Sequence, residues 1–485
     1  MIHQSITRRR FLQASTGTLA GILAPSLPGP AWPQPDNNID TQPAASGKLP
    51  NVVFIFADQL RSCSVGCYGN PEVDTPNMDR LAADGALFVH SISTSPVSTP
   101  YRACLMTGRY PTATGVFANS FKLQRTETGI AEIFQAHGYQ TKFIGKWFLN
   151  GPVPDPVADP GWVPPEDRHG FQTWTGFNGA HVYYDGKYYV DDNPTIQTLA
   201  PGVYEPDFQT DEAIRFITEK RGASFCLFMS IGTPHPQNIG RDRPPGGDYT
   251  YPYDPESMTL RPNVDYADKE YCRREYADYY GITSNFDWNI GRIMDTLNKL
   301  KLDNETIMVV ASDHGDYVGS QFSHVNKFRG KTTIYTESLN VPCILRYPSG
   351  VVPTVVNEVF TPVDVMPTLL RLCKLRVPDN VMGRDFAPRL FTGAEPLEPP
   401  YGPVPSTESA LIGMFKGQWV GAYTPEYSMA CRRKTLLPNK LFHNTNDPYQ
   451  MYNCVDDPAY QGVLKDLYNQ MLDWLEYVGY QDWPR

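Results

Sequence analysis

Short apolar runs that end abruptly in polar residues constrain the fold of this chain more than any other sequence feature. Four such runs are found, at residues 51–57, 224–230, 306–312 and 341–347, and residues 139–144 form a further predicted strand of mixed composition. Continuous apolar runs of this length are typical of strands buried on both faces of a sheet. Helical patterns separate them, at residues 129–137, 211–220, 269–301 and 363–373. This alternation predicts an α/β fold with a large, mostly parallel sheet sandwiched by helices.

After about residue 380 the sequence pattern changes to short predicted strands with turns, which indicates a second, smaller region. Residues 410–427 and 440–453 have the pattern of short strands with turns, and residues 461–478 that of a terminal amphipathic helix. We therefore expect a main domain over residues 50–375 and a C-terminal α+β subdomain over residues 376–485, with a short antiparallel sheet and that helix. Residues 150–210 are expected to form a long loop region.

The N-terminus is expected to direct export. Thr7-Arg8-Arg9-Arg10-Phe11-Leu12 precedes a short apolar run and then several prolines, a pattern similar to bacterial twin-arginine signals. The run is shorter than the roughly 20 residues of a membrane span, so we expect no span in the mature protein; a membrane-tethered N-terminus is the alternative. Residues 1–49 are thus predicted to be a signal peptide and Pro-rich linker of a periplasmic or secreted bacterial protein, exported by the twin-arginine machinery.

Charge and cysteine content narrow the classes of function. The net charge of −10 gives no support to a nucleic-acid partner or to a basic membrane-surface protein. The nine cysteines are scattered, and Cys63 and Cys67 form the one close pair. This favours buried thiols over a metal cluster, with a disulfide as the alternative.

Polar residues follow four of the predicted strands directly. Because the carboxyl ends of parallel strands meet at one edge of a sheet, these residues should converge there. They are Asp58 and Gln59, Lys146, His235, and Asp313 and His314.

Residues 98–109 form a compact motif between two of these strands. A loop of small polar residues leads to Ser98, Pro100 suits a first helical turn, and Gly108 suits a helix end. A short helix from about 100 to 107 is predicted, with the Ser98 hydroxyl at its N-terminus and Arg102 one turn along. Taken alone, Ser98 would be read as a helix N-cap on a surface helix.

The residues at the predicted sheet edge suit metal-assisted chemistry. Carboxylate and amide oxygens favour Ca²⁺ before Mg²⁺ or Mn²⁺, and His314 either donates a hydrogen bond or indicates a softer metal. Arg102, Lys146 and Lys331 would hold a tetrahedral oxyanion, and His235 would protonate a leaving alkoxide. This set predicts hydrolysis of a sulfate or phosphate ester.

Several motifs together resemble one family. Ser98-Thr99-Pro100-Tyr101-Arg102 with Leu105, Thr107, Gly108 and Arg109 is similar to the signature of formylglycine-dependent sulfatases, which belong to the alkaline-phosphatase-like superfamily. The resemblance extends over about residues 50–485, in family order. It includes Ala57-Asp58-Gln59, Gly66-Cys67-Tyr68-Gly69, Thr75-Pro76-Asn77, Gly145-Lys146-Trp147, Pro234-His235-Pro236, Ser312-Asp313-His314-Gly315-Asp316, Gly330-Lys331 with Tyr335 and Glu337, and Asn446-Asp447-Pro448-Tyr449.

The resemblance implies a role for each site residue. Ser98 would be oxidised to formylglycine (3-oxoalanine) by a cytoplasmic maturase, and the hydrate of that aldehyde would attack sulfur. Calcium would be held by Asp58, Gln59, Asp313, His314 and residue 98. Sulfate or residue 98 would be bound by Arg102, Lys146 and Lys331, while His235 would protonate the leaving group. Residues 50–375 would then be the sulfatase catalytic domain.

Two positions depart from the family pattern. Tyr101 stands where Ser is commonest, and Phe148 stands where the family usually has a His that contacts formylglycine. Either His181 or His324 fills that place, or turnover is slow, or the site has changed function. His181 lies in an aromatic-rich segment and is also a candidate substrate contact, against the alternative of a plain surface histidine.

Three hypotheses follow from the sequence. The first is an exported sulfatase that acts on a sulfated small molecule or oligosaccharide, most plausibly a sulfated sugar. The second is a phosphoester or phosphonate ester hydrolase with Ser98 unmodified. The third, motivated by Phe148, is a weakly active or non-catalytic binder of sulfated glycans.

Overall fold

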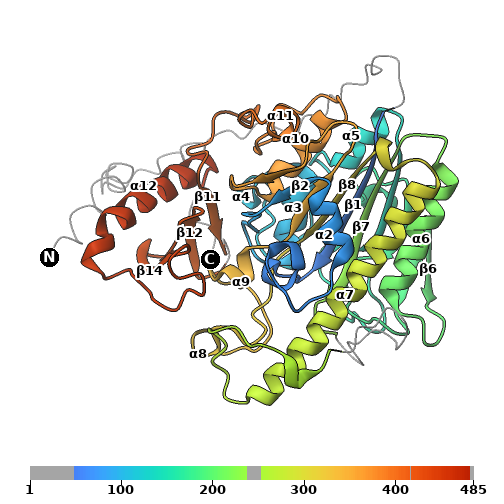
Figure 1. Cartoon of the computed structure of the whole chain (residues 1–485). Helices are drawn as coiled ribbons and strands as arrows, with labels where there is room; N and C mark the ends of the chain where they lie inside the picture. The colour runs from blue at the N-terminus through green and yellow to red at the C-terminus, as the bar shows by residue number, and fades with distance from the viewer. Residues whose placement is uncertain (1–48, 238–252, 415–416, 481–485) are drawn as a thin grey trace, which may run out of the picture. The chain divides into compact units, whose positions relative to one another are not determined.

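The computed structural model of the chain describes residues 49–237, 253–414 and 417–480 (Figure 1). The predicted signal peptide and almost all of the predicted linker lie outside these residues. All described residues belong to one compact unit. The division near residue 375 stays a prediction.

A large mixed sheet forms the centre of the described structure. Its ten strands lie in the order β10 (Thr354–Val356), β2 (Ala86–Phe88), β9 (Cys343–Arg346), β8 (Thr306–Ser312), β1 (Asn51–Asp58), β7 (Phe225–Pro234), β3 (Gln140–Lys146), β4 (Thr173–Phe177), β5 (Lys187–Val190) and β6 (Asn193–Thr198).

The middle of this sheet is parallel and its outer strands are mixed. Strands β8, β1, β7, β3 and β4 are parallel neighbours, with Ile55 of β1 opposite Val310 on one side and Met229 on the other. Strand β9 runs antiparallel to β8 and β2, and β5 runs antiparallel to β4 and β6. The apolar runs at 51–57, 224–230 and 306–312 thus correspond to β1, β7 and β8 in the middle of the sheet, whose two faces are both covered.

Helices cover both faces of the sheet (Figure 1). Alternate side chains of β1 enter different cores: Phe54 packs in one core and Ile55 in the other. The core with Phe54 also contains residues of α3 (Ser98–Thr107), α5 (Ile130–Ala136), α10 (Pro362–Leu372) and α11 (Ala387–Thr392). The core with Ile55 contains residues of α2 (Pro76–Ala83), α6 (Glu205–Lys220) and α7 (Lys269–Lys299).

The remaining helices of the described residues are short. They are α4 (Pro111–Thr114), α8 (Phe322–Val325), α9 (Thr336–Leu339) and the 3₁₀ turns η1 (Ser62–Ser64), η2 (Gly66–Tyr68), η3 (Pro165–Asp167), η4 (Pro255–Ser257), η5 (Asp303–Glu305) and η6 (Pro458–Tyr460).

The C-terminal region contains the antiparallel sheet and terminal helix that the sequence predicts. The strands are β11 (Ala410–Gly413), β12 (Trp419–Tyr423), β13 (Tyr427–Arg432) and β14 (Leu437–His443), followed by α12 (Gln461–Tyr477). This sheet contacts the loops around the main sheet: the Gly413 amide donates to the Thr94 carbonyl at 2.8 Å, and the Trp419 indole donates to the Thr332 carbonyl at 2.8 Å.

Three expectations from the sequence need correction or completion. Residues 150–210 are not one loop, because they contain β4, β5 and β6; these strands are short, and β6 is mostly exposed, so no long apolar run marks them. All nine cysteines are free thiols, so the alternative of a disulfide is wrong. Among the described residues, no helix has both the length and the apolar character that crossing a membrane requires.

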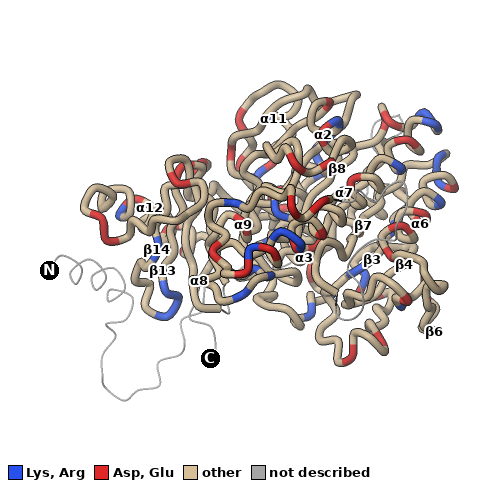
Figure 2. The backbone as a smooth tube through the Cα atoms, turned by 60° about the horizontal axis from the view of Figure 1, so that its bottom comes forward, with Lys and Arg blue, Asp and Glu red and all other residues tan. Residues whose placement is uncertain are grey.

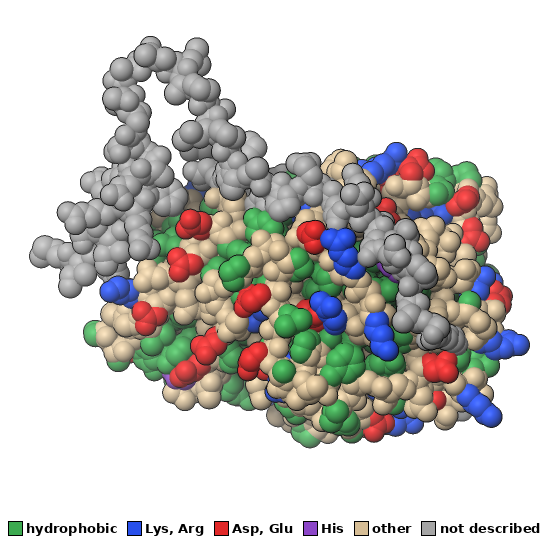
Figure 3. Space-filling model, turned by 90° about the horizontal axis from the view of Figure 1, so that it is seen from above, with side chains coloured by type: hydrophobic (Ala, Val, Ile, Leu, Met, Phe, Trp, Pro, Cys, Tyr) green, Lys and Arg blue, Asp and Glu red, His purple; other side chains and the backbone are tan. Residues whose placement is uncertain are grey.

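The surface is mixed in character. Lys and Arg are interspersed with Asp and Glu over the described backbone (Figure 2). Seen from above, hydrophobic side chains are interspersed with charged ones (Figure 3). Exposed large hydrophobic residues include Val352 and Tyr452, which lie far apart in the sequence.

Candidate active site

Ser98 is the first residue of α3, and its side chain faces the polar ends of the central strands. The N-cap of α3 is Val97 and no side chain caps the helix, so the interpretation of Ser98 as an N-cap is wrong. All ten residues of α3 are buried, which also excludes a surface helix. Ser98 Oγ lies 3.1 Å from Nε2 of His314 and 3.5 Å from Nζ of Lys146. Packing against the sheet edge therefore determines the surroundings of Ser98.

The strand ends meet at this edge. Asp58 is the last residue of β1 and Lys146 the last of β3, while His235 directly follows β7 and Asp313 directly follows β8. Nζ of Lys146 lies 2.6 Å from Oδ2 of Asp58. The structure thus brings together residues that are up to 255 positions apart in the sequence, as expected for the carboxyl ends of neighbouring parallel strands.

Arg102 contacts two carboxylates of this group through its guanidinium. Its Nη2 donates to Oδ2 of Asp58 at 3.2 Å and of Asp313 at 3.3 Å, and its Nη1 donates to Ser230 Oγ at 2.7 Å. The side chain is 1% exposed. Arg102 therefore holds the two carboxylates in place, and it is not among the residues that line the pocket next to Ser98.

Burial and neighbouring charges shift the pKa values of the ionisable side chains at this edge of the sheet. Burial lowers the pKa of Lys146 to about 8. Burial also raises the pKa of Asp313, to about 6, with the Asp58 carboxylate adding to that rise. For Asp58 burial acts in the same direction, but Lys146 and its neighbours outweigh it and hold the pKa well below the ordinary value.

Asp58, Asp313 and His314 form a donor set that fits a divalent cation. Their ligand atoms lie within 4.8 Å of one another, and Oδ1 of Asp58 is buried with no hydrogen-bond partner among the described residues. Burial, and then Lys331, lower the pKa of His314 well below its ordinary value, so the imidazole is neutral. Its Nδ1 donates to the Gly315 carbonyl at 3.2 Å, leaving Nε2 as a ligand atom.

Gln59 is also a predicted metal ligand, but both polar atoms of its side chain bind other residues of the protein. Its Oε1 accepts a hydrogen bond from Lys331 Nζ at 2.7 Å, and its Nε2 donates to Asp316 at 2.8 Å. Its backbone amide donates to Oδ1 of Asp313 at 3.1 Å. Burial lowers the pKa of Lys331 as well. Gln59 therefore links the carboxylates to Lys331, a lysine that lines the pocket.

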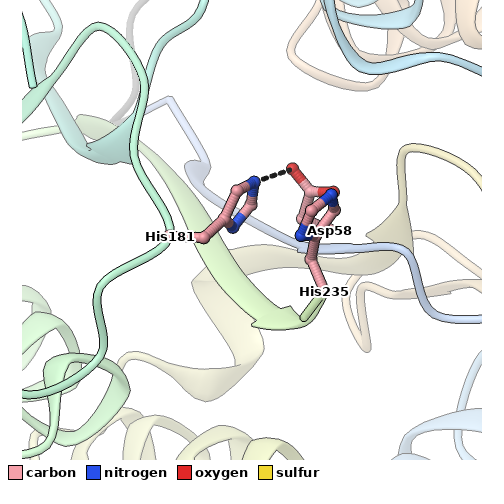
Figure 4. A group of neighbouring side chains, drawn as sticks. All are labelled: Asp58, His181 and His235. Carbon is pink, nitrogen blue, oxygen red and sulfur yellow. Dashed lines mark ion pairs between the residues drawn. The ribbon is translucent and has the colours of Figure 1, made fainter. Parts of the chain in front are cut away.

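His181 and His235 lie beside Asp58 (Figure 4), and their two rings stack on each other. Their ring centroids are 3.7 Å apart and their planes differ by 5°. Nε2 of His181 lies 3.0 Å from Lys146 Nζ and 3.9 Å from Oδ2 of Asp58. His181 is 7% exposed, so the alternative of a surface histidine is wrong. Sequence reasoning undervalued this residue, because a lone histidine in a loop carries no spacing signal.

The pocket next to Ser98 has a volume of about 210 Å³. Its lining includes four ionisable side chains, those of Lys146, His181, His235 and Lys331, and besides Ser98 the remaining lining residues are Asn119, Ser120, Phe148, Val153, Pro156, Gly179 and Ala180. His324, in contrast, is exposed on α8 and is not among the lining residues. Of the two histidines considered as replacements at position 148, His181 is the one that contacts Lys146.

Phe148 is held firmly in the wall of this pocket. Its ring lies 4.5 Å from Lys146 Nζ, its φ is +57°, and its amide donates to the Asn178 carbonyl at 2.6 Å. A Cβ atom at Gly179 would lie 2.6 Å from the Phe148 ring. Residue 179 therefore has to be glycine for the phenyl ring to occupy this place.

Comparison with known proteins agrees with this geometry. The Sulfatase family profile matches residues 50–375. The chain is 33% identical over 435 residues to an ulvan-active sulfatase of Formosa agariphila, covering 86% of this chain and 79% of that protein. It is 27% identical to an endo-4-O-sulfatase of Bacteroides thetaiotaomicron, covering 89% and 92%.

Solved structures show the same fold. A chain solved in work on glycosaminoglycan metabolism by Bacteroides thetaiotaomicron superimposes with a TM-score of 0.76 at 26% identity, covering 89% of this chain and 97% of that one. A phosphonate monoester hydrolase from Silicibacter pomeroyi, at 20% identity and a TM-score of 0.67, covering 88% and 95%, shares the fold. The match to the family profile over more than half of the chain, together with a relative at 33% identity, shows that the chain belongs to the sulfatase family and is a sulfuric ester hydrolase.

Proposed function

We propose that this sulfatase is exported and removes sulfate from a sulfated carbohydrate, with a formylglycine made from Ser98 as its nucleophile. The observation that carries the proposal is the position of Ser98 Oγ, between His314 Nε2 and Lys146 Nζ and in the wall of the pocket. Relatives named for sugar substrates, such as an N-acetylglucosamine-6-O-sulfatase of Bacteroides thetaiotaomicron at 24% identity over 85% of this chain, support a sulfated sugar as substrate.

Ser98 would need modification for turnover. A serine hydroxyl that attacks sulfur forms a stable sulfate ester, whereas the hydrate of an aldehyde at residue 98 has a second hydroxyl that can expel sulfate. The chain supplies the surroundings for this chemistry. Lys146 Nζ and His314 Nε2 both lie within hydrogen-bonding reach of Oγ, so residue 98 is oriented by two side chains.

The sulfate group would be bound by the two lysines of the pocket. Lys146 and Lys331 line it, and both ammonium groups are held by acceptors of the protein, Asp58 and Gln59. Fixed cations in a buried site stabilise a tetrahedral oxyanion more strongly than mobile ones in water. Arg102 contributes indirectly, because it neutralises the carboxylates of Asp58 and Asp313.

His235 is placed to protonate the leaving alkoxide. Its Nδ1 donates to the Pro236 carbonyl at 2.7 Å, which leaves Nε2 to carry the transferable proton. Burial lowers the pKa of His235 well below its ordinary value, with His181 and Lys331 adding to the effect. A bound sulfate ester brings negative charge into the pocket and opposes that shift, so substrate binding favours the acid form.

Asp58, Asp313 and His314 would hold calcium, with Mg²⁺ or Mn²⁺ as alternatives. A divalent cation there would offset the two buried carboxylates and lower the energy of negative charge developing on the substrate. We further propose that residues 1–49 direct twin-arginine export, which transports folded proteins, so that a cytoplasmic maturase can act on Ser98 first and the protein then reaches the periplasm or the exterior.

Mass spectrometry of residue 98 tests this function. After co-expression with a bacterial formylglycine-generating maturase, the tryptic peptide Leu81–Arg102 should show a loss of about 2 Da, the two hydrogens removed from Ser98. The same protein should release sulfate from members of a panel of sulfated mono- and oligosaccharides, and Ser98→Ala should show neither result.

Other outcomes would contradict the proposal. An unmodified peptide combined with phosphate or phosphonate ester hydrolysis would identify a phosphoester hydrolase. A modified peptide with binding of sulfated sugars but no sulfate release would identify a binding protein. A protein that stays in the cytoplasm when residues 1–49 are intact would contradict export.

A further inference from the structure

We propose that His181 is a positioning residue of this active site, which holds the Lys146 ammonium toward residue 98 and the His235 ring toward the substrate. This role rests on the proposed function, because Lys146 and His235 are the residues that His181 serves. His181 follows Asn178, Gly179 and Ala180 after β4, and its side chain points to the polar end of β7 (Figure 4).

Tyr183 determines which nitrogen of His181 carries the proton. The Tyr183 hydroxyl lies 2.6 Å from the carbonyl oxygens of both Gly232 and His235, so its single proton is donated to one of them. The hydroxyl must then accept from Nδ1 of His181, 3.2 Å away. Nε2 of His181 is left as an acceptor, and it is this atom that faces Lys146.

His181 therefore orients the Lys146 ammonium. An ammonium group has three protons, and its nearest partners are Oδ2 of Asp58 at 2.6 Å, Nε2 of His181 at 3.0 Å and Ser98 Oγ at 3.5 Å. With two protons directed at Asp58 and His181, the third is directed at residue 98. Lysine is a flexible chain of four carbons, so the loss of one acceptor would let the ammonium turn away.

His181 also restrains His235. The two rings lie face to face, with centroids 3.7 Å apart and planes within 5°. The Nδ1 bond of His235 to the Pro236 carbonyl fixes one edge of its ring, and the face of His181 prevents rotation about that edge. One side chain thus contacts both the cation next to residue 98 and the proposed acid.

Strand β7 leaves room for Tyr183 and His181 because residue 232 is a glycine. A Cβ atom at Gly232 of β7 would lie 2.9 Å from the Tyr183 ring and 3.5 Å from Nδ1 of His181. A side chain at residue 232 would push Tyr183 away from the carbonyls that fix its proton. Gly232, Tyr183 and His181 therefore form one packed unit behind the reactive groups.

Two substitutions separate the contacts of His181. His181→Phe keeps a flat ring against His235 but removes the acceptor for Lys146, whereas His181→Gln keeps an acceptor and removes the ring. In protein with wild-type formylglycine content, we expect His181→Phe to lower kcat about 100-fold, because misplacement of a reactive group has effects of this size. KM should change less than about threefold, and His181→Gln should recover about tenfold of the loss in kcat.

The exposed histidine on α8 provides the control. His324→Phe makes the same chemical change outside the pocket, so its kcat and KM should equal those of the wild type. Tyr183→Phe, which keeps the ring and removes only the hydroxyl, should lower kcat about tenfold, because the proton on His181 is no longer fixed. Tyr183→Phe and His181→Gln decide the matter if His181→Phe does not fold.

The outcomes separate this role from the proposed function. Wild-type kcat in His181→Phe, or in both Tyr183→Phe and His181→Gln, would overturn the positioning role while leaving the sulfatase function intact. If the wild type releases no sulfate, the proposed function fails, and crystal structures of the wild type and His181→Phe test the positioning. We expect Lys146 Nζ to leave residue 98 in the variant; an unchanged Nζ position would overturn the role.

Discussion

The pocket next to Ser98 and a cleft beside the C-terminal sheet differ in size and in the state of their charges. The cleft is the larger, at about 670 Å³ against about 210 Å³. It lies between α11, α12 and the β12–β13 turn, and its lining includes Glu358, Arg389 and Glu426. Cavity volume alone would therefore select the cleft and not the pocket that contains Ser98.

Burial of charge distinguishes the two. In the cleft, Arg389 and Glu358 form an ion pair at 2.6 Å with side chains 22% and 24% exposed. At the pocket, Lys146 of its lining and the Asp58 carboxylate behind it form a pair of the same length, with side chains 3% and 0% exposed. A partly exposed pair costs little to form, whereas buried charges carry a large desolvation cost and persist where the surrounding groups compensate it. The difference teaches that concentrated buried charge, more than cavity size, identifies a reactive site.

Asp58→Asn should have the largest effect. The carboxylate holds Lys146 and Arg102, and its Oδ1 faces the proposed metal position. We expect kcat to fall about 10³-fold and bound calcium to be lost, because both a cation and its ligand are disturbed. Sulfate release and elemental analysis of the purified protein measure the two effects. Glu358→Gln in the cleft should change neither kcat nor bound calcium. Equal effects of the two variants would show that the pocket next to Ser98 is no more reactive a site than the cleft.

Arg102→Met should reduce stability strongly. Removing this buried cation takes one charged hydrogen-bond donor from both Asp58 and Asp313 and leaves their two buried charges less compensated, which should lower the free energy of unfolding by about 3–5 kcal/mol. Urea unfolding in the presence of a chelator measures this without a contribution from metal. Arg389→Met removes the partly exposed pair of the cleft and should cost less than about 1 kcal/mol. Similar losses for the two variants would show that burial does not set the cost.

Glu205→Gln should change how stability depends on pH, because it replaces a buried carboxyl that lies outside the pocket lining. Burial raises the pKa of Glu205 from 4.5 to about 8. Between these values the folded state keeps a proton that the unfolded state has lost, so wild-type stability falls as the pH rises from 5 to 8. Glutamine resembles the protonated form, and the variant should gain about 3–4 kcal/mol relative to the wild type between pH 5 and pH 8, at about 1.4 kcal/mol for each pH unit. A difference that does not change with pH, measured by urea unfolding, would contradict the expected cost of burial.

Phe148→His should have the smallest effect. An imidazole at residue 148 would lie near Lys146, but His181 already accepts a hydrogen bond from that lysine. We expect kcat to change less than about threefold. A gain of about 10²-fold or more in sulfate release would show instead that a proton-transfer group is missing from the wild-type pocket.

The central part of the fold could be predicted from local sequence. The run at residues 306–312 coincides with β8, and the run at 51–57 with β1 except for its last residue. Gly108 ends α3 with φ +65°, as a glycine at a helix end does. These features depend on neighbouring residues in the chain, so pattern and propensity are sufficient to find them.

The antiparallel edges could not be predicted in the same way. Strand β6 has mostly exposed residues, and β5 contains four residues between turns. Their pairing depends on β4 being available as an edge, which is a property of the assembled sheet. Composition rich in Tyr, Asp and Gly therefore suggested a loop where the chain forms short strands.

The sequence by itself determined the parallel strand centre, the polar residues at its strand ends and the motif that begins at Ser98, because each follows from residues close together in the chain. The tertiary structure alone decided that Ser98 lies against His314 instead of capping its helix, that Arg102 binds both carboxylates, and that His181 contacts Lys146 beside Phe148. These contacts depend on how loops pack over the sheet edge, and their free energy comes from burying charges that are distant in sequence.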